Sequence, residues 1–122
     1  LSSSTRELID EDFVESMKDG SILINTARGG ILKSHACLYQ GLLSGKLSGV
    51  GLDVIPQEPP VLKDDDDFLS AWIKNDQDFR GRIIINPHTA YYSEDSYQEM
   101  RIKAATSALN ALIDNQLTNR II

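Results

Sequence analysis

Four side chains that could bind or titrate a small substrate come shortly after apolar, strand-like runs of the chain: Arg28, Asp53, Glu58 and His88. The runs are 22–24, 50–52 and 83–85, each of them short and continuous, as in buried strands. In an open α/β sheet, ligands bind beyond the carboxyl ends of the strands. The order of these blocks therefore predicts one site in which an arginine, two carboxylates and a histidine converge.

Arg28 and His88 carry the clearest chemistry. A guanidinium stays charged and can grip both oxygens of a carboxylate, and Gly29 and Gly30 would let a 2-oxo or 2-hydroxy acid approach the backbone. A histidine can exchange a proton near neutral pH, and Glu58 could hydrogen-bond its ring and hold its orientation. The plain alternatives are a surface arginine in a turn and a capping or core histidine, and the second is how we interpret His35.

Asp53 ends the second apolar run. Its carboxylate could accept a hydrogen bond from an amide such as that of nicotinamide, or it could cap the following turn. Gly49 and Gly51 precede it, but position 54 is Val54 where a dinucleotide fingerprint needs a third small residue. The sequence contains no phosphate-binding glycine loop.

The elements that must position these residues alternate between helix and strand. We expect helices at 11–18, 34–44 and 93–115 and strands at 21–26, 49–54 and 82–86. Asp10 is the predicted N-cap of the first helix, and Gly45 falls just past the second. This alternation indicates an α/β fold with a parallel sheet that is covered on both faces.

A polar excursion separates the last two strands, from Pro56 to Arg80. Its acidic run 64–67 is typical of a solvated surface, because four adjacent like charges repel. Metal binding is the alternative, but adjacent carboxylates do not face one point, and we expect no metal. A short amphipathic helix should pin the excursion to the body through Phe68, Leu69, Trp72 and Ile73.

The last predicted helix has a wide apolar arc. One stripe contains Met100, Ala104, Ala108 and Ala111, and the neighbouring stripe contains Ile102, Ala105, Leu109 and Leu112. Such an arc needs cover on two sides, from another domain or another subunit. We therefore divide the chain into a partial domain at 1–92 and a C-terminal helix at 93–122 that packs on a separate domain.

The bulk properties exclude several classes of function. A net charge of −6 and a pI near 4.7 argue against a nucleic-acid or anionic-membrane surface. Cys37 is the single cysteine, no apolar run could span a bilayer and no secretory signal opens the chain, so we expect a cytoplasmic protein. The chain starts at Leu1 without an initiator methionine, and we expect a fragment of a protein heavier than 13.5 kDa.

Several blocks in this order resemble the D-isomer-specific 2-hydroxyacid dehydrogenase family. They are Leu1–Arg6, Met17–Gly20, Ile22–Gly30, Ser44–Leu47, Gly51–Val54, Glu58–Pro59 and Pro87–His88. The resemblance implies the second half of a doubly wound, Rossmann-type parallel sheet, with flanking helices and a long C-terminal helix. The glycine-rich half of the cofactor domain and the substrate domain would precede Leu1.

The resemblance also implies a role for each matching residue. Arg28 would bind the substrate carboxylate, His88 would be the general acid/base and Glu58 its partner. The cofactor would be NAD, with NADP as the alternative, because the acidic residue that discriminates them is outside this sequence. Its contacts would come from Thr26, Ala27, Arg28, Asp53, His88 and Tyr91, while Leu1 to Thr5 would lie near the adenosine ribose.

Two functions are compatible with these residues. The first is an oxidoreductase that interconverts small D-2-hydroxy acids and 2-oxo acids by hydride transfer, as a homodimer in the full-length protein. The second is a dehydrogenase-like, NAD-sensing binding or corepressor protein. The motif Tyr91–Glu94 and the long excursion are most similar to the branch that holds the C-terminal-binding proteins. Arg28, Glu58 and His88 belong to both readings and do not discriminate between them.

Overall fold

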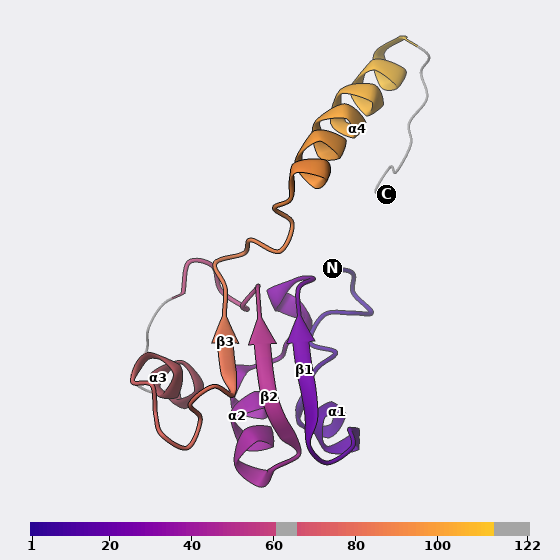
Figure 1. The fold of residues 1–122 in the computed structure, drawn as a ribbon. Helices are drawn as coiled ribbons and strands as arrows, with labels where there is room; N and C mark the ends of the chain where they lie inside the picture. Colours follow the sequence, from indigo (N-terminus) through magenta and orange to yellow (C-terminus); the bar gives the residue numbers. More distant parts are fainter. Residues whose placement is uncertain (61–65, 114–122) are drawn as a thin grey trace. The chain divides into compact units, whose positions relative to one another are not determined.

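The computed structural model of the chain describes residues 1–60 and 66–113. It divides into two compact units, Leu1–His88 and Thr89–Ile122. The first unit holds a small sheet with its helices, and the second holds one long helix (Figure 1). Each unit is described by itself.

Three parallel strands form the sheet of the first unit, in the order β1-β2-β3 (Figure 1). They are β1 (Ser21–Asn25), β2 (Leu47–Leu52) and β3 (Ile83–Ile85). Asn25 lies opposite Leu52, and Leu52 lies opposite Ile85, so the three carboxyl ends form one edge. The predicted strands are confirmed in number and direction, although β2 begins and ends two residues earlier than expected.

The helices connect the strands. They are α1 (Glu11–Ser16), the 3₁₀ turn η1 (Gly29–Ile31), α2 (His35–Ser44) and α3 (Asp67–Ile73). Asp10 caps α1 as predicted, because its Oδ1 accepts from the Phe13 amide at 2.9 Å. Gly45 ends α2 with a φ of 79°, the left-handed conformation that glycine adopts without strain.

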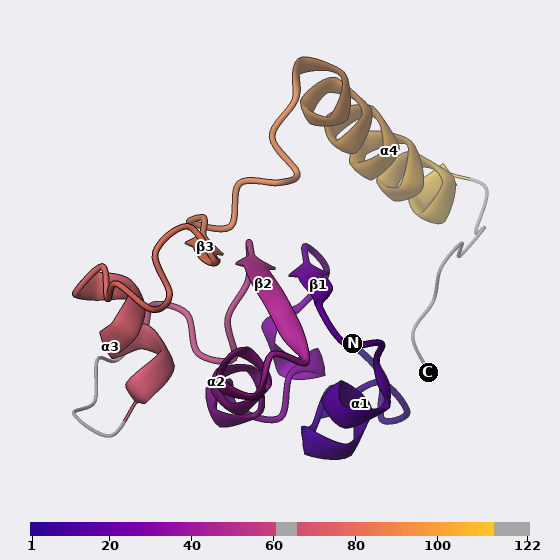
Figure 2. The same ribbon diagram turned by 60° about the horizontal axis from the view of Figure 1, so that its bottom comes forward.

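All three α-helices of this unit lie on the same face of the sheet (Figure 2). The core between helices and sheet contains Leu38, Leu42, Leu47, Leu52 and Phe68, each at most 2% exposed. Phe68 and Leu69 are buried in it, which confirms that a short helix pins the excursion to the body. The excursion therefore contributes to the fold rather than forming only a surface loop.

The opposite face of the sheet is exposed in this unit. Ile22, Ile24 and Ile84 point to that face, and they are 66%, 71% and 59% exposed. Our expectation of helices on both faces is thus wrong for this unit. Successive crossovers between parallel strands are right-handed, and strands added in one direction place their helices on the same side.

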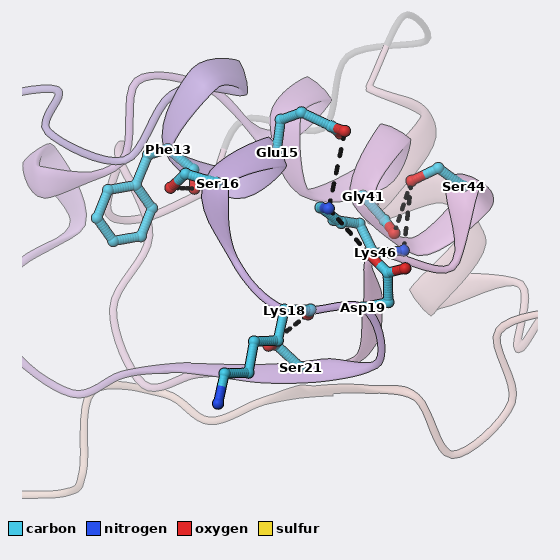
Figure 3. Close-up of polar contacts among 9 residues, drawn as sticks. All are labelled: Phe13, Glu15, Ser16, Lys18, Asp19, Ser21, Gly41, Ser44 and Lys46. Carbon is cyan, nitrogen blue, oxygen red and sulfur yellow. Dashed lines mark hydrogen bonds and ion pairs between the residues drawn. The ribbon is translucent and has the colours of Figure 1, made fainter.

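At the amino ends of the strands, ion pairs connect the turns that lead into β1 and β2 (Figure 3). The Lys46 ammonium lies 2.9 Å from Asp19 Oδ1 and 3.7 Å from Glu15 Oε1. The Ser21 hydroxyl donates to the Lys18 carbonyl at 2.6 Å and closes the turn into β1. The hydrogen bond with Asp19 raises the pKa of Lys46 above its ordinary value.

The second unit contains α4 (Glu94–Ile113), which confirms the predicted helix over those residues, while 114 and 115 lie outside the described part. Ser93 lies directly before it and caps it, since the Ser93 hydroxyl accepts from the Ser96 amide at 3.2 Å. Within the described range α4 has no buried residue, and its large apolar side chains are exposed. No helix of the described residues is long and apolar enough to cross a membrane.

We expect the isolated 122-residue chain to self-associate or to bind hydrophobic dyes. The apolar sheet face and α4 both expose large aliphatic side chains, and contiguous apolar patches of more than a few hundred Å² are uncommon on monomers. Light scattering with a dye titration measures both properties, and Ile24→Lys should weaken them. A monodisperse monomer that binds no dye would contradict the expectation.

Candidate functional site

Backbone hydrogen bonds extend the sheet past the ends of its strands. The Asp53 amide donates to the Asn25 carbonyl at 2.9 Å, and the Asn86 amide donates to the Leu52 carbonyl at 2.8 Å. The His88 amide then donates to the Asp53 carbonyl at 2.9 Å. Asp53 and His88 are therefore fixed side by side at the carboxyl edge, as the sequence predicted.

Asn25 fixes the loop that follows β1. Its side chain is buried, its Nδ2 donates to the Arg28 carbonyl at 3.1 Å, and its Oδ1 accepts from the Ala27 amide at 3.0 Å. The two bonds define the path of the chain on either side of Ala27. Sequence reasoning assigned Asn25 no role, although a polar residue at an inward strand position was a usable signal, because buried amides need local partners.

Gly29 brings the Arg28 loop against the loop after β2. A Cβ at position 29 would lie 1.8 Å from the Ile55 carbonyl oxygen, so only glycine fits there. This contact sets Arg28 beside the segment that leads to Glu58. The Arg28 side chain is exposed, and its Nη1 donates to the neighbouring Ala27 carbonyl at 2.7 Å.

His88 and Glu58 form the central polar contact. His88 Nδ1 lies 2.7 Å from Glu58 Oε2, and Glu58 Oε1 accepts from the Ile55 amide at 3.1 Å. Both carboxylate oxygens are thus engaged. The hydrogen bond with His88, followed by that from Ile55, holds the pKa of Glu58 below its ordinary value of 4.5. His88 has a φ of 55°, a left-handed backbone that non-glycine residues adopt mainly where the surroundings enforce it.

Arg28, Glu58 and His88 line one cavity of about 190 Å³. Gly29, Gly30 and Leu1 complete part of its wall, and the Leu1 side chain lies over Gly30. The structure therefore brings the three predicted catalytic residues together. The cavity thus has a cation, Arg28, that can bind a ligand carboxylate, and a histidine whose ring is hydrogen-bonded to Glu58.

Of the predicted cofactor contacts, only Arg28 and His88 line this cavity. Thr26 and Ala27 are exposed in the loop after β1, and Asp53 is 4% exposed and lines a second cavity, of about 400 Å³, that His88 and Glu58 also line. Tyr91 belongs to the second unit, so its role beside the cofactor stays a prediction.

His35 has the structural role expected of it. Its Nδ1 lies 2.7 Å from Asp66 Oδ2, and its ring stacks on Phe68. Asp66 also caps α3, since its Oδ1 accepts from the Leu69 amide at 3.0 Å. Two members of the acidic run, Asp64 and Asp65, lie outside the described residues. In 1–60 and 66–113 no group of three His, Cys, Asp or Glu side chains could hold a metal ion.

Comparison with known proteins identifies the class. Residues 1–90 match the NAD binding domain of the D-isomer specific 2-hydroxyacid dehydrogenases, so the chain belongs to that family. It is 38% identical over 98 residues to a glycerate dehydrogenase of Methylorubrum extorquens, across 80% of this chain and 28% of that protein. It is 35% identical to a D-specific alpha-keto acid dehydrogenase of Enterococcus faecalis, across 90% of this chain and 34% of the relative.

Solved structures give the same result. A glyoxylate reductase from Paecilomyes thermophila superposes with a TM-score of 0.74 at 30% identity, over 97% of this chain and 32% of that one. A D-lactate dehydrogenase from Aquifex aeolicus, complexed with NAD and lactic acid, has a TM-score of 0.69 at 30% identity, over 94% and 35%. The expected Rossmann-type fold is confirmed, and the chain spans about a third of the length of these relatives.

We expect His88→Ala to raise the pKa of Glu58 toward its ordinary value, because the strongest of the contacts that lower it is lost. Carboxyl NMR titration measures this shift. Because folding lowers this pKa, the pair stabilises the fold above the ordinary carboxyl pKa, and the effect is lost as pH falls through the lowered value. Glu11, whose pKa is lowered by Lys33, is the internal control and should titrate as before. An unchanged Glu58 midpoint in His88→Ala would contradict the assignment.

Proposed function

We propose that this chain works as part of an NAD-dependent oxidoreductase that interconverts small D-2-hydroxy acids and 2-oxo acids. The observation that carries the proposal is the cavity shared by Arg28, Glu58 and His88 at the carboxyl edge of the sheet. A carboxylate-binding cation and a positioned acid/base are what this reaction requires of the protein. The family membership and the names of the relatives support the same reaction class.

His88 would move the proton. Its Nδ1 is engaged with Glu58, so Nε2 is the nitrogen that exchanges a proton with the oxygen on C2 of the substrate. In oxidation, neutral His88 takes the hydroxyl proton while the C2 hydrogen leaves as hydride and the carbon–oxygen double bond forms. In reduction, protonated His88 returns that proton to the 2-oxo oxygen. Glu58 stabilises the charged ring during each transfer.

The residues present fit the nicotinamide end of NAD, which supplies the hydride donor and acceptor when bound. The Asp53 carboxylate has the acceptor chemistry that a carboxamide needs, and it lies at the strand edge next to His88. The backbone at Thr26 and Ala27, held by Asn25, would line the same end. The proposed cofactor is NAD, which the match to an NAD binding domain supports, and NADP is the alternative.

Two wider properties belong to the proposal. We propose a homodimer, supported by the exposed apolar arc of α4 and the exposed isoleucines of the sheet. We also propose a reducing, cytoplasmic setting, supported by Cys37, a buried free thiol whose pKa is raised by burial.

His88→Gln should lower kcat of the intact protein by about 10²-fold or more, the usual contribution of a positioned acid/base. Glutamine keeps hydrogen-bonding capacity at this position but cannot exchange a proton. Steady-state kinetics with a panel of 2-oxo acids and NADH measures the loss. Lys33→Gln is the control, since the Lys33 ammonium pairs with Glu11 and lines neither cavity, and this variant should keep wild-type turnover. A wild-type kcat in His88→Gln would contradict the assignment of His88 as the acid/base. It would favour the alternative function, an NAD-sensing binding protein.

Arg28→Lys should act mainly on KM. An ammonium keeps the charge but cannot donate two parallel hydrogen bonds to one carboxylate, and a hydrogen bond to a charged group contributes about 1.5–3 kcal/mol. We therefore expect KM for the 2-oxo acid to rise by about 10-fold or more, with kcat changed far less. Arg82→Lys is the control, because Arg82 donates to backbone carbonyls of Leu42 and Leu47 away from the cavity. A fall in kcat at unchanged KM would assign Arg28 another role.

A further inference from the structure

A second cavity meets the first at the His88–Glu58 pair. It has a volume of about 400 Å³, and both His88 and Glu58 line it, as they line the cavity of about 190 Å³ that holds Arg28. Small-molecule sites usually occupy roughly 300–1,000 Å³. The Arg28 cavity alone is below that range, whereas the larger one falls within it, and His88 and Glu58 line both.

The wall of the larger cavity is mostly apolar, and its polar members are Asp53, Glu58, Asn86 and His88. Its aliphatic and aromatic side chains include Pro59, Pro60, Leu69, Trp72, Ile85 and Pro87. No Lys or Arg among the described residues lines this cavity, so an anion placed there would lose hydration and be repelled by the Asp53 and Glu58 carboxylates. The cavity therefore suits a branched aliphatic or aromatic group and disfavours a second carboxylate or a phosphate.

The helix α3 places Trp72 at this cavity. Leu69 is 5% exposed and packs in the core, whereas Trp72, three residues later on the same helix face, is 41% exposed and lines the cavity. The helix is held from two sides, by Phe68 in the core and by the contact of Asp66 with His35. A large, half-exposed aromatic side chain thus lines the same cavity as His88 and Glu58.

We infer that this cavity receives the side chain at C3 of the substrate, so that the protein acts best on 2-oxo acids with branched aliphatic or aromatic side chains. The inference rests on the proposed function. With the carboxylate on Arg28 and the C2 oxygen at His88, the remaining carbon substituent passes the His88–Glu58 pair into the apolar space. Trp72 and Leu69 form the surface that selects it, and Trp72 is a specificity residue.

The test combines a substrate panel with Trp72→Ala in the intact protein. Wild type should reduce 4-methyl-2-oxopentanoate with at least about 10-fold higher kcat/KM than pyruvate, since each apolar group bound in a hydrophobic pocket contributes about that factor or more. Trp72→Ala should lower kcat/KM for 4-methyl-2-oxopentanoate by about 10-fold, mainly through KM, and leave pyruvate unchanged. Trp72→Phe should retain most of the preference. Ile73→Ala is the matched control, because Ile73 is 52% exposed on the same helix and is not part of the cavity wall.

A binding measurement separates this inference from the proposed function. Trp72 is the single tryptophan of the chain, so its fluorescence in the 122-residue chain reports the cavity directly. Titration with 4-methylpentanoate should change the emission, and acetate should not. That response without turnover of any 2-oxo acid would overturn the proposed function and leave the apolar site standing. A preference for pyruvate, or an equal loss for both substrates in Trp72→Ala, would overturn the inference and leave the function standing.

Discussion

The hydrogen bonds that carry the sheet beyond its strand ends are the constraint on which the site depends. Asp53 receives a backbone bond from His88 and gives one to Asn25, so three separate loops share a single frame. Backbone bonds of this kind fix position far better than contacts between long exposed side chains. His88 can therefore hold a left-handed backbone and still present its ring to Glu58 at 2.7 Å.

The two edges of the sheet have different roles. At the amino ends, Lys46 and its carboxylates close the turns and stabilise the fold, and these groups are exposed, so each pair contributes little alone. At the carboxyl ends, the polar groups are arranged around cavities. Gly29 illustrates the difference, because its close contact with Ile55 leaves no room for a side chain and serves only to bring two loops together.

The sequence predicted the strands, the helices and the convergence of Arg28, Glu58 and His88, because short apolar runs and caps are local signals that tertiary packing here reinforces. It failed on the second face of the sheet, since coverage depends on crossover handedness and on what else packs there. It gave no role to Asn25, whose partners are visible only once the loop is folded. Trp72 was placed correctly on a helix that pins the excursion, but its position at a cavity beside His88 depends on how α3 packs.

The family relationship and the local geometry support each other without being the same argument. Homology places residues 1–90 in an NAD binding domain, and the geometry shows that Arg28, Glu58 and His88 of that segment line one cavity. The excursion between β2 and β3 contributes residues to both cavities. It supplies Glu58, the hydrogen-bond partner of His88, and it supplies α3 to the wall of the larger cavity, so the proposed chemistry and the proposed selectivity both depend on one segment.

The most direct test of the central claim is a crystal structure of the intact protein with NAD and an unreactive 2-oxo acid analogue such as oxamate. The account predicts that both oxygens of the analogue's carboxylate accept from the Arg28 guanidinium. It also predicts that the 2-oxo oxygen lies within about 2.6–3.2 Å of His88 Nε2, the reach of a proton-transferring hydrogen bond. An analogue bound away from Arg28, or with His88 turned from Glu58 and out of reach of the ligand, would contradict it.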